Sequence, residues 1–159
     1  MMLKYGIASY LYPMQRLSTF LHKKGYSFIP LIKVASGHYI CTAEINGIKG
    51  RFIVDSGASH TCVALEKEKH FEIIAFESDE QAATASSQDV DTKQSTSNQI
   101  KLGDWMRNKQ ELVVIHLETV NAALDNLGVE QVDGILGANL LHKTKAILDF
   151  KQNRLYLKK

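Results

Sequence analysis

One carboxylate stands at the end of an apolar run and is the residue best placed to do chemistry in this 159-residue chain. The run Phe52–Val54 predicts a buried strand, and Asp55-Ser56-Gly57 follows it directly. Burying a carboxylate is costly unless a partner compensates it, and Gly57 allows a sharp turn there. Two such carboxylates within hydrogen-bond distance share one proton, so one can activate a water while the other protonates a carbonyl oxygen.

A second segment changes how that tripeptide is interpreted. Taken alone, Asp55-Ser56-Gly57 is most often an ordinary turn after a strand. Farther along, Val132–Leu141 reads VDGILGANLL, with two apolar residues, a glycine, a small residue, Asn139 and the start of a short apolar helix. Asp133-Gly134 at its beginning lacks a central hydroxyl residue, so we do not count Asp133 as a second catalytic acid.

Together the two segments resemble the aspartic proteases of the retroviral type. That family carries apolar-apolar-Asp-Ser/Thr-Gly-Ala, matched by Ile53–Ala58, and later apolar-apolar-Gly-x-Asn-Leu-Leu, matched by Ile135–Leu141. The resemblance covers Phe28–Leu157. It implies an all-β, closed retropepsin-like barrel or sandwich with a short helix after the second motif.

The resemblance also assigns roles to individual residues. Asp55 becomes the catalytic acid, supported by Ser56 and Gly57, and the second motif packs beneath the catalytic loop without taking part in chemistry. The structural residues of that motif are Ile135, Leu136 and Gly137. The expected substrate-binding residues are Ala58 and Ser59, together with a flap tip at Ala82, Ala83, Thr84, Ala85 and Ser86.

The chain has a single Asp-Ser-Gly motif, which implies a homodimer with one Asp55 from each subunit at the twofold axis. We therefore expect an aspartic endopeptidase that hydrolyses peptide or protein substrates with a water nucleophile and needs no cofactor or metal. Many family members have an ion pair where this chain has Ser59 and Ala138. Losing both partners is milder than losing one, and the N-terminal helix could replace that support.

The flap segment departs from the family pattern. Ser78–Asn98 is polar, and its composition favours a flexible loop. Family flaps usually carry glycines at the tip, whereas no glycine occurs between Gly57 and Gly103. This is the main argument for an alternative, a catalytically silent retropepsin-like module that dimerises or binds peptides.

Residues 1–25 are expected to form a helical extension before a protease domain at residues 26–159. Pro13 at a first helical position, Leu17 and Leu21 at helical spacing, and Gly25 past the end predict one amphipathic helix. No acidic residue precedes Glu44. Packing of this helix on its own body or on a partner subunit is favoured over membrane contact, although a membrane-associated scaffold is a third functional alternative.

From Ser27 onward the spacing of apolar residues changes towards every second position, which predicts β-strands. Asn46-Gly47 predicts a tight hairpin between two of them. A short helix over Val120–Leu127, capped by Gly128, should interrupt the later strands. The predicted strands are Phe28–Val34, His38–Ile45, Lys49–Val54, Thr61–Leu65, Phe71–Phe76, Ile100–Leu102, Leu112–Leu117, Ala146–Phe150 and Arg154–Leu157. The last pair forms a hairpin that is a candidate dimer contact.

Other function classes receive little support. A net charge of +2 gives no overall nucleic-acid footprint. Cys41 and Cys62 form neither a disulfide framework nor a zinc pattern, and no apolar run spans a bilayer, so a cytoplasmic protein is expected. Adjacent Ser59 and His60 should point to opposite faces of an extended strand, which argues against a Ser/His/Asp triad. His60 and His70 lack a third metal ligand at suitable spacing, although His60 could line a subsite.

Overall fold

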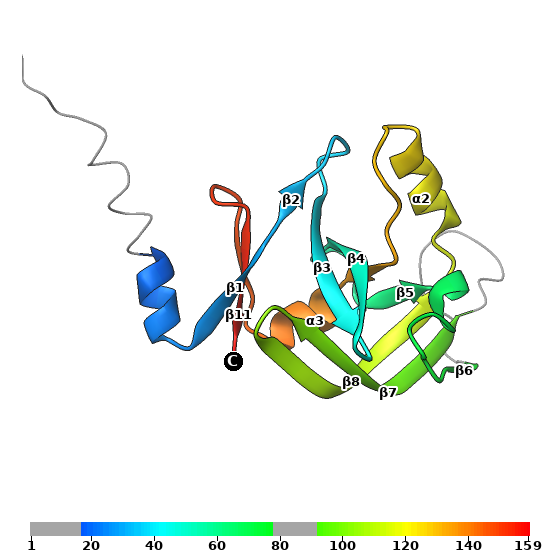
Figure 1. The fold of residues 1–159 in the computed structure, drawn as a ribbon, viewed down its shortest axis with the longest axis horizontal. Coiled ribbons are helices and arrows are strands. Elements are labelled where there is room, and N and C mark those ends of the chain that lie inside the picture. Colours follow the sequence, from blue (N-terminus) through cyan, green and yellow to red (C-terminus); the bar gives the residue numbers. More distant parts are fainter. Residues whose placement is uncertain (1–16, 78–91) are drawn as a thin grey trace, which may run out of the picture.

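Six strands close into a barrel, and the strand that leads to Asp55 is one of them (Figure 1). The computed structural model describes residues 17–77 and 92–159. Each barrel strand pairs with the next, and pairing of the first with the last closes the ring. In ring order the strands are β3 (Tyr39–Ile45), β4 (Ile48–Val54), β9 (Gly134–Leu136), β5 (Cys62–Ala64), β8 (Trp105–Ile115) and β7 (Lys93–Leu102).

The remaining elements surround this barrel. Two short strands, β2 (Ile32–Lys33) and β6 (Phe76–Glu77), extend its sheet beyond β3 and β7. A separate three-stranded sheet has the order β1 (Tyr26–Pro30), β11 (Arg154–Lys158) and β10 (Ile147–Asp149). Besides a helix over residues 17–23, the helical elements are a 3-10 turn η1 (Leu65–Lys67), α2 (Glu118–Asp125) and α3 (Ala138–Lys143). The predicted all-β fold with a closed barrel and a short helix after the second motif is confirmed.

Alternation along the barrel strands separates an inner core from an outer layer. Phe52 is fully buried in the main core, whereas the next residue, Ile53, packs in a second cluster with Leu124 of α2. Successive side chains of a strand point to opposite faces, so a strand covered on both sides reads as a continuous apolar run. This explains the uninterrupted Phe52–Val54 sequence ahead of Asp55.

Helix α2 is tied to the chain that leads into β9 by one buried side chain. The Asn121 amide nitrogen donates to the Val132 carbonyl at 3.0 Å, and the Val132 backbone N–H donates to the Asn121 oxygen at 2.9 Å. Asn121 is 5% exposed. The Asn121 side chain thus makes the two hydrogen bonds that the backbone of a neighbouring strand would otherwise make with Val132. It thereby fixes the chain just before the second motif.

The helix before the barrel ends as predicted. Residues 17–23 are helical, Leu21 is buried, and Gly25 has a φ of +81°, the left-handed conformation favoured after a helix. The predicted start at Pro13 lies outside the described residues. Within the described ranges, no helix combines the length and apolarity needed to cross a membrane.

Two predictions about the middle of the chain were wrong. Phe71–Phe76 is not a strand: only β6 is extended there, because Phe71 turns into the core and Glu72 takes a φ of +52°. The polar segment Ser78–Asn98 is also not entirely loop. Its last part, from Lys93, belongs to β7, where the buried amide of Asn98 donates to Ser95 and to the Gln110 carbonyl. The predicted flap tip, Ala82 to Ser86, lies outside the described residues.

Asn121→Ala should lower the free energy of unfolding by about 2–4 kcal/mol, because it leaves the Val132 N–H and carbonyl without partners in a buried site. Urea unfolding followed by circular dichroism measures this change. Asn126→Ala, at the exposed end of the same helix, is the control and should stay within about 0.5 kcal/mol of the unchanged chain. Equal effects of the two substitutions would show that the contact with Val132 contributes nothing.

Candidate active site

Asp55 is held in place by the strand that carries the second motif. Strands β4 and β9 pair in parallel, with Val54 opposite Leu136, and the Asp55 N–H donates to the Leu136 carbonyl at 3.1 Å. On its other side β9 pairs with β5. Asp55 therefore leaves the sheet at a point fixed by strands from two distant parts of the chain.

The loop itself orients the carboxylate. The Gly57 N–H donates to Asp55 Oδ1 at 2.8 Å, and the Ala58 N–H donates to the Asp55 carbonyl oxygen at 3.3 Å. Asp55 is half-buried, while Ser56 and Gly57 are exposed. The Ser56 hydroxyl makes no hydrogen bond to residues 17–77 or 92–159, so it is available to another molecule.

The second motif supports this loop from below through Gly137. A Cβ atom on Gly137 would collide with the carbonyl group of His60 and lie 2.9 Å from the Ala58 oxygen. The two backbones can approach this closely only because the position has no side chain. The approach lets the Ala138 N–H donate to the Ala58 oxygen at 2.7 Å and the Asn139 N–H donate to the Ser59 oxygen at 3.1 Å.

A contact between Thr61 and the motif residue Asn139, which the sequence analysis did not predict, joins the loop to the second motif. Asn139 Oδ1 accepts the backbone N–H and the hydroxyl of Thr61, both at 2.8 Å, and the Thr61 hydroxyl also accepts the Gly137 N–H at 3.1 Å. Thr61 is fully buried. In the sequence Thr61 resembles an ordinary strand residue. The only sign of this contact in the sequence is that a hydroxyl residue precedes an apolar strand while the second motif contains an amide side chain.

The side chains of Ser59 and His60, which lie between the Asp55 loop and β5, are closer together than the sequence analysis predicted. The Ser59 hydroxyl lies 3.0 Å from His60 Nδ1, because residues 57–60 bend and do not run extended, so the prediction of opposite faces was wrong. In the described ranges no acid is bound to the His60 ring, and a Ser/His/Asp triad is not formed. Both side chains are exposed, and His60 lines a hollow of about 230 Å³ beside Gln94 and Glu111.

Asp133 has a purely structural environment. Its Oδ2 accepts the Arg51 backbone N–H at 2.9 Å, and its Oδ1 pairs with Lys67 at 3.0 Å. The carboxylate thus fixes the entry to β9 against β4 and lies in a different part of the barrel sheet from Asp55.

The two cysteines are buried free thiols, in agreement with their predicted role as reduced core residues. Burial raises the pKa of Cys41 to about 12. Burial is also the main cause that raises the pKa of Cys62 to about 12, and the nearby Asp55 charge acts in the same direction. In the described part of the chain no group of three His, Cys, Asp or Glu side chains could hold a metal ion.

The geometry and the family comparison agree. Residues 41–140, which contain both motifs, match the family of aspartyl proteases. The chain belongs to this family. No curated protein matches it in sequence.

Solved structures of similar fold include cellular and viral members. A retropepsin-like aspartic protease from Rickettsia conorii is 18% identical, with a TM-score of 0.55 over 84% of this chain and 89% of the other. The retroviral protease-like domain of Ddi1 from Leishmania major is 15% identical, with a TM-score of 0.52 over 74% and 86%. The EIAV protease bound to the inhibitor HBY-793 is 14% identical, with a TM-score of 0.52 over 73% and 96%. At these identities the likeness establishes the retropepsin-like fold.

Thr61→Val keeps the shape of the side chain but removes the hydroxyl between Gly137 and Asn139, so we expect a loss of about 1–3 kcal/mol in the free energy of unfolding. Chemical denaturation measures it. Thr42→Val, at an exposed position of β3, is the matched control and should be near neutral. Thr61→Ser should restore most of the loss, and a Val variant as stable as the control would contradict this role of the hydroxyl.

Proposed function

We propose that this aspartyl protease family member is an active endopeptidase whose protease domain spans residues 26–159. Its catalytic centre would contain two Asp55 carboxylates, one from each subunit of a homodimer. The observation that carries the proposal is the placement of Asp55, which leaves the barrel sheet beside β9 with one carboxylate oxygen bound to the Gly57 N–H. An ordinary turn would not need support from a second, distant motif.

The need for a second chain follows from the surroundings of Asp55. Asp133, the acid just before the second motif, accepts a hydrogen bond from the Arg51 backbone N–H and pairs with Lys67. Ser56 and Gly57 are exposed beside Asp55, so a second copy can approach this loop around a twofold axis. The free Ser56 hydroxyl is then positioned to support the pair across that axis.

The reaction follows from two carboxylates that share one proton. The ionised carboxylate removes a proton from a water molecule, which attacks the peptide carbonyl carbon, while the protonated partner donates to the carbonyl oxygen. In the collapse of the tetrahedral intermediate, the carboxyl group that took the water proton gives it to the leaving amine nitrogen, the other carboxylate accepts a proton from a hydroxyl of the intermediate, and the C–N bond breaks. Ala58 and Ser59, which follow the loop, and the segment containing residues 82–86 would contact the substrate.

The alternative is a catalytically silent module that uses the same fold to dimerise or to bind peptides. The absence of glycine between Gly57 and Gly103 favours it, since flap closure over a substrate needs a turn. Incubation with a diverse peptide pool from pH 4 to pH 7, with and without a transition-state inhibitor of aspartic proteases, separates the two functions. Inhibitor-sensitive cleavage supports the enzyme, whereas peptide binding without cleavage supports the module.

Asp55→Asn should reduce peptide cleavage by orders of magnitude while the fold persists, because the amide can neither act as a base nor share the proton. Activity of the unchanged dimer should follow a bell-shaped pH profile whose two limbs belong to the coupled pair. The variant should be at least as stable at pH 7, since it removes the repulsion between two facing carboxylates. Cleavage assays and thermal melts at pH 7 measure both effects.

Asp133→Asn is the matched control for this substitution, since it makes the same change at the acid that directly precedes β9. It should lower the melting temperature by weakening the contact with Lys67, while cleavage survives. Unchanged cleavage by Asp55→Asn together with a destabilised fold would falsify the catalytic assignment.

The chain should be a dimer at micromolar concentration, and Ser56→Glu should dissociate it by placing two extra acids at the twofold axis. Light scattering gives the mass of each variant. Thr119→Glu, on the exposed surface of α2, adds the same charge away from the loop and should leave the dimer intact. A strict monomer, even with a peptide inhibitor present, would argue against catalysis by this pair.

A further inference from the structure

A hollow beside the catalytic loop contains polar groups that neither the fold nor the pair of Asp55 carboxylates uses. The loop that begins at Asp55 ends at His60, which lines this hollow of about 230 Å³. The Thr61 carbonyl accepts the Val113 N–H at 3.0 Å and so fixes strand β8 against the end of the loop. Five residues of chain span at most about 18 Å, and an extended hexapeptide spans about 20 Å. A peptide bound at Asp55 can therefore place one of its side chains in the hollow.

An irregularity in the pairing of β7 with β8 opens the hollow. Ser95 pairs with Leu112 and Asn98 pairs with Gln110, so two residues of β7 face Glu111 alone. The Asn98 amide donates to Ser95 Oγ at 2.9 Å and to the Gln110 carbonyl at 3.2 Å. These three polar side chains are at most 2% exposed. A bulge of this kind redirects side chains, and here buried hydrogen bonds fix it from the core side.

The wall of the hollow combines hydrogen-bond donors with a carboxylate. The Ser59 hydroxyl lies 3.0 Å from His60 Nδ1, which leaves Nε2 as the free nitrogen of the ring. When the hydroxyl donates to Nδ1, the ring hydrogen is on Nε2, and in a protonated ring Nε2 also donates. The Gln94 amide and the Thr96 hydroxyl, also in this wall, make no hydrogen bond within the described part of the chain. Glu111 supplies a carboxylate acceptor.

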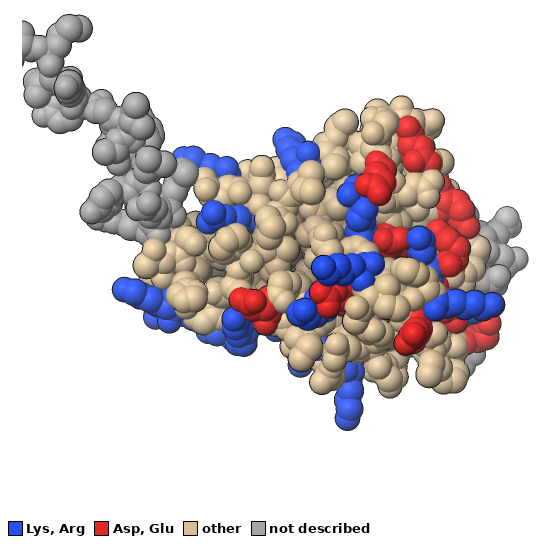
Figure 2. Space-filling view, in the orientation of Figure 1, with Lys and Arg blue, Asp and Glu red and all other residues tan. Residues whose placement is uncertain are grey.

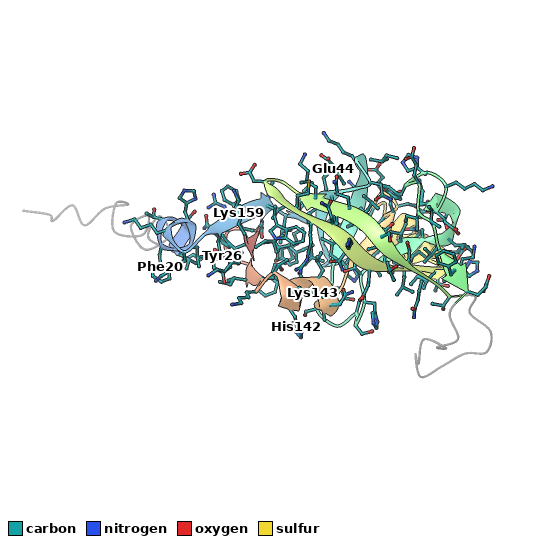
Figure 3. The ribbon with its side chains drawn as sticks, turned by 90° about the horizontal axis from the view of Figure 1, so that it is seen from below. Phe20, Tyr26, Glu44, His142, Lys143 and Lys159 are labelled. Atoms are coloured by element: carbon teal, nitrogen blue, oxygen red, sulfur yellow. The ribbon has the colours of Figure 1, made fainter. Side chains whose placement is uncertain are left out.

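Charges of both signs lie around the hollow. The Lys143 ammonium group lies 3.8 Å from the Glu111 carboxylate, and both side chains are exposed. Lys143 belongs to α3, on the side of the molecule opposite Glu44 (Figure 3). Lys and Arg also lie among Asp and Glu near α2 on the face drawn in Figure 2, so no single sign of charge covers that face. The groups inside the hollow therefore decide which side chain it accepts.

We propose that this hollow binds the side chain of a Gln or Asn residue of the substrate peptide, an inference that rests on the proposed function and adds a substrate class to it. A primary amide presents its carbonyl oxygen to His60 and its NH₂ group to Glu111, and it brings no charge. A carboxylate would face Glu111, whereas an ammonium group would compete with Lys143 and face His60. An apolar side chain would leave these polar groups without partners. Leu112 and Val113 in the wall contact the methylene groups.

Cleavage of matched peptides tests this selection. A peptide pool that carries every side chain at every position should show Gln and Asn enriched at one position near the scissile bond. Four peptides that differ only there, with Gln, Glu, Lys or Leu, should give a kcat/KM about tenfold higher for Gln than for each of the others, which is the effect of one hydrogen bond or charge contact in an open site. Equal kcat/KM values for the four peptides would overturn the proposal.

Two substitutions should change this selection in opposite directions. Glu111→Gln removes the acid, so the preference for the Gln peptide over the Glu peptide should fall about tenfold. His60→Gln should instead reduce the preference over the Lys peptide. Glu66→Gln, at an exposed position of η1, removes the same charge as Glu111→Gln and should leave every ratio unchanged. Thermal melts check that each variant is folded. Equal changes for all four peptides in both variants would show a purely structural role and overturn the proposal.

Peptide binding separates this inference from catalysis. The Asp55→Asn variant should bind the Gln peptide about tenfold more tightly than the Leu peptide, as measured by fluorescence anisotropy. An unchanged chain that cleaves no peptide but keeps this preference in binding would overturn the proposed function and support the selection of an amide. Cleavage of all four peptides at equal rates would do the reverse. Absence of both cleavage and a binding preference would overturn both.

Discussion

The parallel pairing of β4 with β9 is the constraint on which the rest of the structure depends. Strand β9 has three residues and lies between β4 and β5, so it joins two segments that are distant in the sequence. A Cβ on Gly134 would collide with the Cys62 carbonyl group, and one on Gly137 would collide with His60. Two glycines therefore let three backbone segments meet, and Asp55 is positioned by that meeting.

Buried polar side chains complete what backbone pairing leaves unfinished. Asn121 holds Val132, Asn139 holds Thr61, and Asn98 is held between β7 and β8. Each supplies hydrogen bonds where a loop or a bulge prevents regular strand pairing. Because an unpaired polar group inside a core is costly, these contacts specify one arrangement of the chain around the catalytic loop.

The terminal sheet is organised separately from the barrel. Strand β11 is central in it, paired with β1 on one edge and with β10 on the other, so its own backbone has no free edge. Any further strand would have to join at β1 or β10. The outer face of this sheet is instead covered by cations, aromatic rings and the helix over residues 17–23, which gives this end a chemistry distinct from that of the catalytic loop.

Local patterns were enough to predict much of this protein. Alternation and apolar runs predicted β3, β4 and α2, and Asn46-Gly47 predicted a tight hairpin whose two residues do have positive φ values. The two motifs predicted the family. Other features depended on contacts between distant segments. Phe71 packs in the core, so the predicted strand Phe71–Phe76 does not form, and the polar residues from Lys93 onward belong to β7. The Thr61–Asn139 contact likewise arises only in the folded chain, because sequence periodicity records which face of an element is buried and not which distant residue it meets.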